Sequence, residues 1–109
     1  MTNIDGDILK GHTLTLILTL IEEQPSYGFQ LAKEIGRRSE GTFNFREGLI
    51  YPALYQLEKE GLIESEWRFS HDGPRRKYYK ITPNGRKEAA RLRKRWSVFE
   101  KAMNQVLES

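Results

Sequence analysis

REGLIYPALYQLEKEG, residues 46–61, is the stretch that decides the fold of this chain. At a helical period its apolar residues fall on one side, and the final glycine stands where a helix commonly ends in a left-handed conformation. The opposite side offers little bulk, several hydrogen-bonding groups and one positive charge, from Gly48, Pro52, Tyr55, Gln56 and Lys59, with Tyr51 at its flank. Such a face suits a helix that enters a DNA groove. An ordinary amphipathic helix is the alternative that this stretch alone leaves open.

Length and composition limit the other possibilities. The chain has 109 residues, which predicts a single domain. It contains no cysteine, which excludes a disulfide framework, a thiolate metal site and a thiol nucleophile, and nothing in it calls for a cofactor. The apolar run Leu14–Ile21 is too short to span a bilayer, and the acidic N-terminus does not resemble a signal peptide. We therefore expect a cytoplasmic protein without a membrane partner.

The small net charge of +3 conceals an uneven distribution. Residues 68–101 contain twelve Lys or Arg against three acidic residues, a net charge of +9, whereas the rest of the chain carries −6. A chain polarised in this way indicates one surface that faces a polyanion. A solvated helix face accounts for part of the basic cluster at 86–95.

Two helices are expected before the opening stretch. The first would be capped by Asp5 or Asp7 and run to about Glu23; residues 13–16 alternate like a strand, but the apolar residues also fit a helical stripe and no hairpin turn lies nearby. The second would run from Tyr27 to about Arg38 after a break at Pro25, with Ser26 as its N-cap.

Details of the second and third helices also carry expectations. Arg37 and Arg38 stand in the last turn of the second helix, where cations complement the helix dipole, so contact with phosphate is only a second explanation for them. The segment Thr42–Phe45 is a candidate short strand. Pro52 removes a backbone hydrogen bond and crowds the carbonyl of Gly48, so the third helix should start late or bend mildly near its N-terminal end.

A hairpin follows the third helix. Residues 62–68 and 77–81 have the alternation of two strands, and the intervening loop, residues 69–76, is longer than a tight turn and should protrude. Arg75, Arg76 and Lys77 on the returning arm suit contact with phosphates or entry into a minor groove. The alternative is an ordinary hairpin whose edge charges deter aggregation.

The last helix has a strong start signal at Thr82-Pro83 and should extend to about Leu107. Apolar residues recur along it at heptad spacing, at Leu92, Trp96, Phe99, Met103 and Val106. A second copy of the chain, contributing Leu9 and Leu16 of its first helix, would cover this stripe. The expected organisation is therefore a winged helix-turn-helix at 1–81, mainly α with a small β-hairpin (α+β), and a dimerisation helix at 82–109 in the same compact unit.

Several segments resemble the PadR-like transcriptional regulators, in order over roughly residues 9–86. They are YGFQL at 27–31, GLIYPAL at 48–54, LEKEGLI at 57–63 and GPRRKYYKIT at 73–82. The short C-terminal helix is similar to that of the small subfamily. The resemblance implies a dimeric DNA-binding repressor, often released by a small molecule, with Tyr51 on the DNA backbone, the surrounding helix in the major groove and Arg75 and Arg76 serving the wing.

The chain departs from the family pattern at Leu49, where Thr is common, and at Gln56, where Arg or Lys is common. Both belong to the side expected to face DNA, so operator sequence cannot be transferred from relatives. Two recognition helices in a dimer would bind an inverted repeat with half-sites about 34–36 Å apart.

Trp96 matches a tryptophan that lines an effector pocket at the dimer interface in some small members. Phe99 and Met103 would give such a pocket an aromatic, adaptable lining for a small aromatic or apolar molecule. The alternative is that all three residues are plain interface core.

Two other functional classes were weighed against DNA binding. Catalysis has little support, because the chain has only His12 and His71 and no serine with a convincing base and orienting acid. A winged helix that binds protein instead of duplex DNA is the stronger alternative, since the fold permits it.

Overall fold

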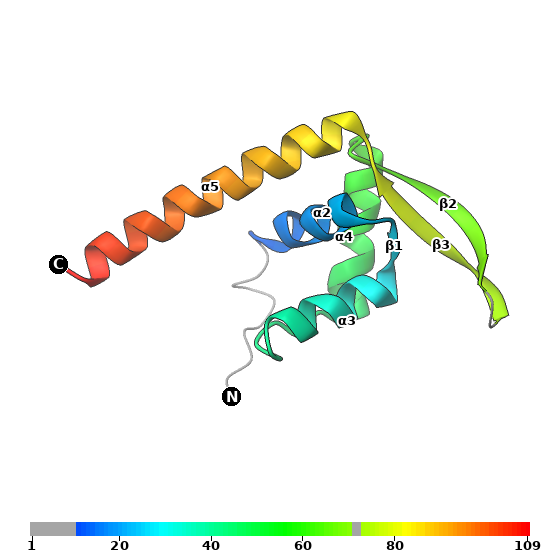
Figure 1. Ribbon diagram of the computed structural model, residues 1–109, viewed down its shortest axis with the longest axis horizontal. Coiled ribbons are helices and arrows are strands. Elements are labelled where there is room, and N and C mark those ends of the chain that lie inside the picture. The colour runs from blue at the N-terminus through cyan, green and yellow to red at the C-terminus, as the bar shows by residue number, and fades with distance from the viewer. Residues whose placement is uncertain (1–10, 71–72) are drawn as a thin grey trace.

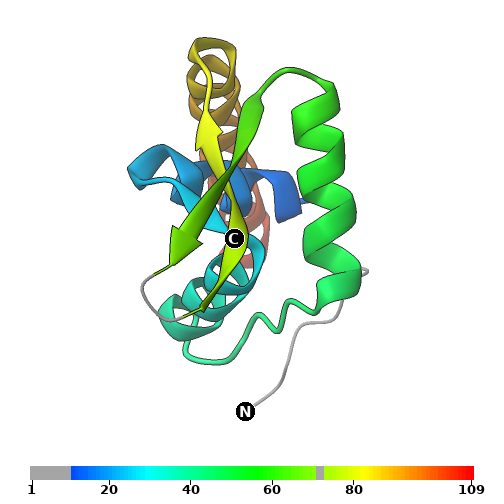
Figure 2. The same cartoon turned by 90° about the vertical axis from the view of Figure 1, so that its right-hand side faces the viewer.

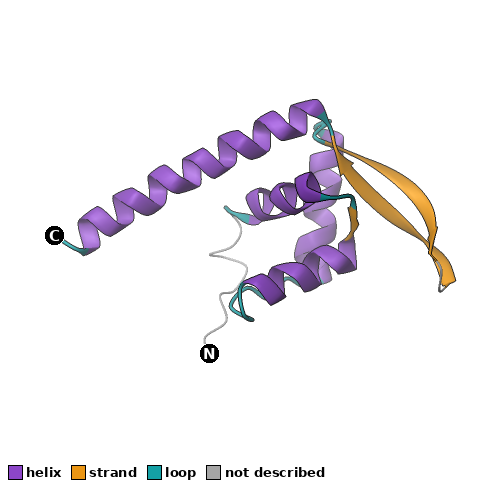
Figure 3. Ribbon diagram, in the orientation of Figure 1, coloured by secondary structure: helices purple, strands orange, loops and turns teal. Residues whose placement is uncertain are grey.

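The computed structural model describes residues 11–70 and 73–109. Helices α2 (Thr13–Glu23), α3 (Gly28–Arg38) and α4 (Glu47–Lys59) precede a hairpin of strands β2 (Ile63–Ser70) and β3 (Gly73–Ile81), and α5 (Pro83–Leu107) ends the chain. A two-residue strand, β1 (Ser26–Tyr27), joins β3. Figures 1 and 3 show the hairpin projecting from one side of the helices while α5 extends away on the other. This arrangement is the predicted winged helix-turn-helix of the α+β class.

The core lies where α2, α3 and α4 meet the base of the sheet. Its fully buried side chains include Ile17, Leu31, Leu54, Leu57 and Ile63, each no more than 1% exposed. The apolar residues on the inner side of α4 are all buried: Ile50, Ala53, Leu54 and Leu57. The amphipathic pattern of residues 46–61 therefore fixes which face of α4 is held by the protein and which face is left outside.

Residues 13–16, whose alternation resembles that of a strand, belong to helix α2, as predicted. Ile17, Leu20 and Ile21 of that helix are buried. The described part of this helix begins at Thr13, after His12, which makes no side-chain capping bond. The predicted caps Asp5 and Asp7 and the predicted interface residue Leu9 lie outside the described residues.

Ser26 is not the N-cap of the second helix, contrary to prediction. Its hydroxyl donates a hydrogen bond to the carbonyl of Gln24 at 3.0 Å, and Ser26 and Tyr27 pair in extended conformation with Tyr79 and Tyr78 of β3. The cap residue is Tyr27, which provides no side-chain bond. Pairing with the sheet therefore displaced the local capping preference of serine.

Helix α4 begins at Glu47, immediately after the cap residue Arg46, so of the late start or mild bend predicted from Pro52 the late start does not occur. Pro52 lies inside the helix, and the carbonyl that it faces belongs to Gly48, which has no side chain to add to the crowding. The candidate strand Thr42–Phe45 is also wrong, because only Phe43 forms a single β-bridge. Gly61, with φ 74°, ends the helix as predicted.

The hairpin is longer and its connection shorter than predicted. Strand β2 continues to Ser70 and β3 begins at Gly73, with Ser70 and Gly73 paired, so most of the expected loop is part of the ladder. A register irregularity between Arg68 and Ser70 accommodates the last pairs. The outer ends of both strands were predicted as a loop because this segment contains Gly73 and Pro74. Among the described residues only β2 flanks this outer part of β3, which allows a proline in the strand.

Helix α5 starts as predicted. The Thr82 hydroxyl accepts a hydrogen bond from the Gly85 N–H at 3.0 Å and donates one to the carbonyl of Gly61 at 2.8 Å, so the cap also ties α5 to the end of α4. Leu92 packs against the core. No helix in the described part of the chain is long and apolar enough to cross a membrane.

Candidate nucleic-acid interface

The outer face of α4 is open to solvent. Tyr51 is 47% exposed and Tyr55 71% exposed, and the other predicted contact residues on this face are exposed as well: Gly48, Pro52, Gln56 and Lys59. Leu49 differs, because it is half-buried and packs against the core. The structure thus brings together most of the predicted recognition face, with Leu49 at its border.

The hairpin carries its arginines on two different faces. The register pairs Trp67 with Lys77 and Arg68 with Arg76, so Arg75, one residue before Arg76, belongs to the Trp67 side. The Arg75 guanidinium lies 5.4 Å from the Trp67 ring centroid and 5.9 Å from that of Phe69. Both rings are exposed, Phe69 to 83%. Cation–π contact with these rings orients the Arg75 side chain near the outer part of the wing.

Arg76 points to the junction of the sheet with α3. Its guanidinium lies 4.5 Å from the Tyr27 ring centroid, and its Nη1 donates a hydrogen bond to the Tyr27 hydroxyl at 2.5 Å. Tyr27 was not among the residues predicted for the site. Its only signal in the sequence was its place in the segment YGFQL, which gave no hint of a partner 49 residues away.

Lys77, the third predicted wing contact, is already paired within the chain. Its Nζ lies 3.7 Å from Oε1 of Glu58, whose Oε2 accepts a hydrogen bond from Ser65 at 2.5 Å. This carboxylate offsets part of the lysine charge. Lys77 therefore presents a partly neutralised charge, whereas no ion pair with a carboxylate of the described residues holds Arg75 or Arg76.

An open hollow of about 540 Å³ lies between the hairpin, α3 and α4. It lies where β1 ends and α3 begins, beside the outer part of β3, and Figure 2 shows the hairpin and α4 at this side of the molecule. The lining comes from α3, α4 and all three strands: Tyr27, Gly28, Phe29, Tyr51, Trp67, Arg75, Arg76, Lys77 and Tyr79. Tyr55, Gln56 and Lys59 lie outside it. The combination of arginines and tyrosine hydroxyls suits a sugar–phosphate backbone.

Burial acts on one tyrosine in this hollow. Tyr79 is 6% exposed, and burial, followed by the nearby charges of Glu58 and Tyr51, raises the pKa of its phenol. Its side chain stays neutral and serves as part of the wall. The charged groups that line the hollow are Arg75, Arg76 and Lys77.

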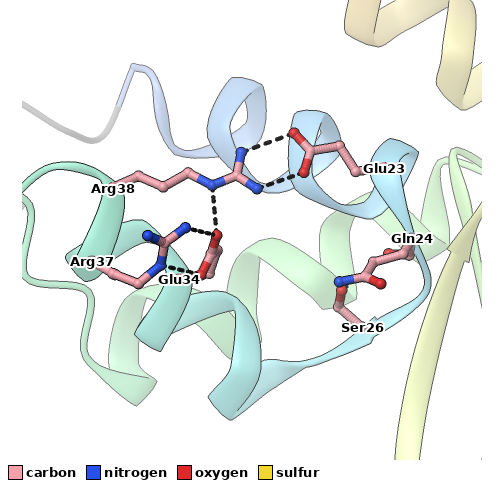
Figure 4. A network of polar contacts seen from close by, with 6 residues as sticks. All are labelled: Glu23, Gln24, Ser26, Glu34, Arg37 and Arg38. Atoms are coloured by element: carbon pink, nitrogen blue, oxygen red, sulfur yellow. Dashed lines mark hydrogen bonds and ion pairs between the residues drawn. The ribbon is translucent and has the colours of Figure 1, made fainter.

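Arg37 and Arg38 have structural partners (Figure 4). Arg38 binds Glu23 through two hydrogen bonds of 2.6 and 2.8 Å and also reaches Glu34, which in turn accepts two bonds from Arg37. Hydrogen bonds from Arg37 and then Arg38 lower the pKa of the Glu34 carboxyl to about 2. Arg38 thereby connects α2 with the end of α3, whereas Arg37 pairs within α3. Both arginines stand in the last turn of α3, as predicted, but their carboxylate partners were not predicted.

A second feature lies on α5, far from the wing. Trp96, Phe99, Met103 and Val106 are 43%, 50%, 46% and 76% exposed in the single chain. A hollow of about 110 Å³ between α2 and α5 is lined by Gly11, His12, Thr15, Leu92, Arg95, Trp96 and Phe99, but Met103 does not line it. The His12 ring meets Trp96 edge-on at 5.2 Å. His12 was not predicted for this site, because the sequence shows no sign that its ring lies beside Trp96 of the last helix. Leu16 is half-buried against the core.

Two successive helices with the second exposed, a basic hairpin beside them and a long protruding final helix define the winged helix-turn-helix fold, which is common among DNA-binding proteins. The model of the transcriptional regulator PadR-like family matches residues 17–91, and the chain belongs to this family. Members are transcriptional regulators and not enzymes. No group of three metal-binding side chains occurs in the described residues.

Individual relatives agree with this assignment. The chain is 33% identical to a transcriptional regulator from Clostridium thermocellum, Cth-833, whose structure superposes with a TM-score of 0.83 over 91% of this chain and 96% of that one. The PadR-like regulator BC4206 of Bacillus cereus gives 32% identity and a TM-score of 0.82 over 94% and 98%. The transcriptional regulator Rv3488 of Mycobacterium tuberculosis is 38% identical over 60 residues, 55% of this chain and 52% of that protein.

Proposed function

We propose that this chain is a homodimeric repressor that binds an inverted repeat in duplex DNA. In this proposal residues 1–81 contact DNA and residues 82–109 hold the dimer. The observation that supports it most directly is that Tyr51, on the exposed face of α4, lines the same hollow as the two arginines of the wing. The outer face of α4 would enter the major groove, where Gln56 can form paired hydrogen bonds with a base edge. Tyr51, Arg75 and Arg76 would contact the backbone, with Lys77 and Lys59 as weaker contacts.

The exposed stripe of α5 supports the dimer. Four large apolar side chains at heptad spacing are 43–76% exposed, and a second copy would bury them. Leu92 would extend this interface toward the core, with Leu16 and the first helix of the partner completing it. A dimer related by two-fold symmetry places its two α4 helices in successive major grooves, and it requires a binding site with the same symmetry.

A small aromatic or apolar effector would bind beside Trp96. The hollow in one chain, about 110 Å³, is smaller than the roughly 300 Å³ at which drug-sized pockets begin, so the partner chain would have to complete the site. Phe99 and Met103 would then form its walls from both copies. Trp96 fluorescence tests this proposal once Trp67 has been replaced by Phe. Titration with neutral, anionic and cationic planar aromatics should change the signal, and a flat response to all of them would refute the pocket.

The alternative is a winged helix that binds another protein. The exposed aromatic side chains support it, since Tyr55 and Phe69 are 71% and 83% exposed. Selection of bound genomic fragments followed by footprinting decides between the two. A two-fold symmetric footprint would support the repressor. So would a plot of log affinity against log salt concentration with a slope of about −0.9 for each neutralised phosphate. If the chain does not bind the DNA around its own coding region, or binds it without regard to sequence, the protein-binding module would be favoured.

A further inference from the structure

We propose that Tyr27 is a positioning residue for DNA binding, because it holds the Arg76 guanidinium in place at the junction of the wing and α3. The inference rests on the proposed function, since it assigns a task within the DNA-binding surface. It also explains why a residue outside both the recognition helix and the wing lies in the hollow that joins them.

Two separate contacts define the position of Arg76. The hydrogen bond from Nη1 to the Tyr27 hydroxyl, at 2.5 Å, anchors one end of the guanidinium. The ring face, 4.5 Å from the guanidinium carbon, restricts the rest of the group. Together they limit the rotamers of a side chain that would otherwise move freely at the surface. A side chain ordered before binding loses less freedom when it meets a phosphate.

Tyr27 is itself held by two elements. Its backbone pairs with Tyr78 in the β1–β3 ladder, and its ring meets the Tyr78 ring edge-on at 5.3 Å and 72°. It is also the cap residue of α3, so its backbone passes directly from strand to helix. A contact with Tyr27 therefore fixes Arg76 relative to the helix-turn-helix, not only relative to the wing.

The group that holds Arg76 is the phenol of Tyr27, which is neutral. Other arginines in the chain are held by carboxylates: Arg38 by Glu23 and Glu34, Arg68 by Glu66, and Arg91 by Glu88. No carboxylate in the described residues forms an ion pair with Arg76. Tyr27 thus orients the guanidinium without cancelling its charge. One N–H is used by the hydroxyl, and no hydrogen bond to a described residue occupies the other four donors, so they can meet phosphate oxygens.

A double-mutant cycle tests this assignment. Tyr27→Phe removes the hydroxyl and keeps the ring, and it is measured in three backgrounds: wild type, Arg76→Ala and Arg76→Lys, the last of which keeps the charge. Binding is measured first with a labelled duplex of mixed sequence at low salt, where weakened variants should still bind. It is then measured with the duplex identified by footprinting. Tyr78→Phe is the matched control, because it removes a hydroxyl from the adjacent ring. Thermal unfolding of each variant monitors folding.

We expect Tyr27→Phe to weaken DNA binding about 3- to 10-fold, which is the size of the effect of ordering one flexible side chain only on binding. The salt slope should hardly change, since the charge of Arg76 is retained, whereas Arg76→Ala should lower the slope by about 0.9. In the Arg76→Ala background Tyr27→Phe should have almost no effect, and Tyr78→Phe should have none in any background.

The opposite results would overturn the assignment. If Tyr27→Phe binds DNA as the wild type does, the hydroxyl has no positioning role. If it weakens binding equally with and without Arg76, its effect is structural and does not pass through the arginine. A wild-type protein that binds no duplex would instead refute the proposed function, and the inference with it.

Discussion

Gly28 and Tyr51 are in direct contact between α3 and α4: a Cβ at residue 28 would lie 2.8 Å from Cε1 of Tyr51 and 3.0 Å from its hydroxyl. The glycine thus leaves the space that the Tyr51 ring occupies. Tyr51 is 47% exposed, so its ring has room to move outward. Any larger residue at 28 would displace the tyrosine from its place beside the wing.

Gly28→Ala should therefore impair DNA binding more than stability. We expect a change in unfolding free energy below about 1 kcal/mol, because an exposed ring yields to the methyl group, but a clear loss of affinity for duplex DNA. The measurements are urea unfolding and fluorescence anisotropy with the selected duplex. Gly36→Ala in the same helix is the control, since a Cβ there meets only the Phe43 carbonyl at 3.8 Å. Unchanged affinity in Gly28→Ala would show that the position of Tyr51 is unimportant for binding.

Gly85→Ala should destabilise the fold itself. A Cβ at this position would lie 2.0 Å from the Leu62 carbonyl oxygen and 2.7 Å from Cγ1 of Ile81. The carbonyl cannot move freely, because it accepts a hydrogen bond from the Thr82 N–H at 3.1 Å. We expect a loss of about 3 kcal/mol in unfolding free energy, at the upper end of overpacking effects. A urea midpoint equal to that of wild type would contradict the close packing of α5 on the end of α4.

Replacing Arg75 and Arg76 together by Ala should weaken binding to all duplexes and lower the salt slope by about 1.8, which is two phosphates at 0.9 each. The matched control is Lys87→Ala with Lys94→Ala, which removes two exposed charges from α5. Gln56→Ala should instead change sequence preference more than overall affinity. The readouts are anisotropy at several salt concentrations and competition between duplexes. Equal slopes for wild type and the wing variant would mean that the wing does not contact phosphates.

Sequence patterns predicted the elements whose determinants are local. The apolar side of α4, the Thr82-Pro83 start of α5 and the glycine at 61 each depend on residues within a turn or two, and each was found. Two of the errors concern long-range pairing. Ser26 has the chemistry of a helix cap, but its segment pairs with β3 more than 50 residues later. The outer wing, read as a loop from its Gly and Pro, is ordered by cross-strand pairs such as Arg68 with Arg76.

The same distinction applies to the candidate site. The exposed face of α4 could be predicted because helical periodicity alone separates it from the core. The contact between Tyr27 and Arg76 could not, since it needs both the β1–β3 register and the place of α3 in space. Nor could the pairing of Lys77 with Glu58, which joins the returning strand to α4.

The network at Glu34 makes a prediction about pH. Hydrogen bonds from Arg37 and Arg38 lower its pKa from 4.5 to about 2 in the folded chain. A lowered pKa means that the contribution to stability is fully present above 4.5 and is lost as the pH falls from there toward 2. Glu34→Gln should therefore be less stable than wild type at pH 7, with a difference that shrinks toward pH 2.5. Because the carboxylate is partly exposed, added salt should reduce that difference.

Urea unfolding of both proteins at pH 7 and near pH 2.5 measures the effect, with Glu60→Gln as a baseline for removing one exposed carboxylate. Glu60 forms no ion pair within the described residues. A stability difference between wild type and Glu34→Gln that stays constant across this range would contradict the network. The binding of DNA at neutral pH should be unaffected, since Arg37 and Arg38 do not line the hollow beside the wing.

Phe99→Glu should separate the dimer into monomers. The Phe99 side chain is 50% exposed in the single chain and lies on the apolar stripe of α5, so a carboxylate there would lose its hydration when the partner covers the stripe. Arg95, which lines the same hollow as Phe99, would offset only part of this cost. We expect the dissociation constant to rise at least about tenfold, equivalent to roughly 1.4 kcal/mol. Gln105→Glu adds the same charge to the opposite side of the helix and should leave the dimer intact. Sedimentation velocity across a range of concentrations distinguishes the two states. If Phe99→Glu and wild type sediment alike, then α5 does not hold the dimer; if the monomer still gives a symmetric footprint, DNA alone brings the two copies together.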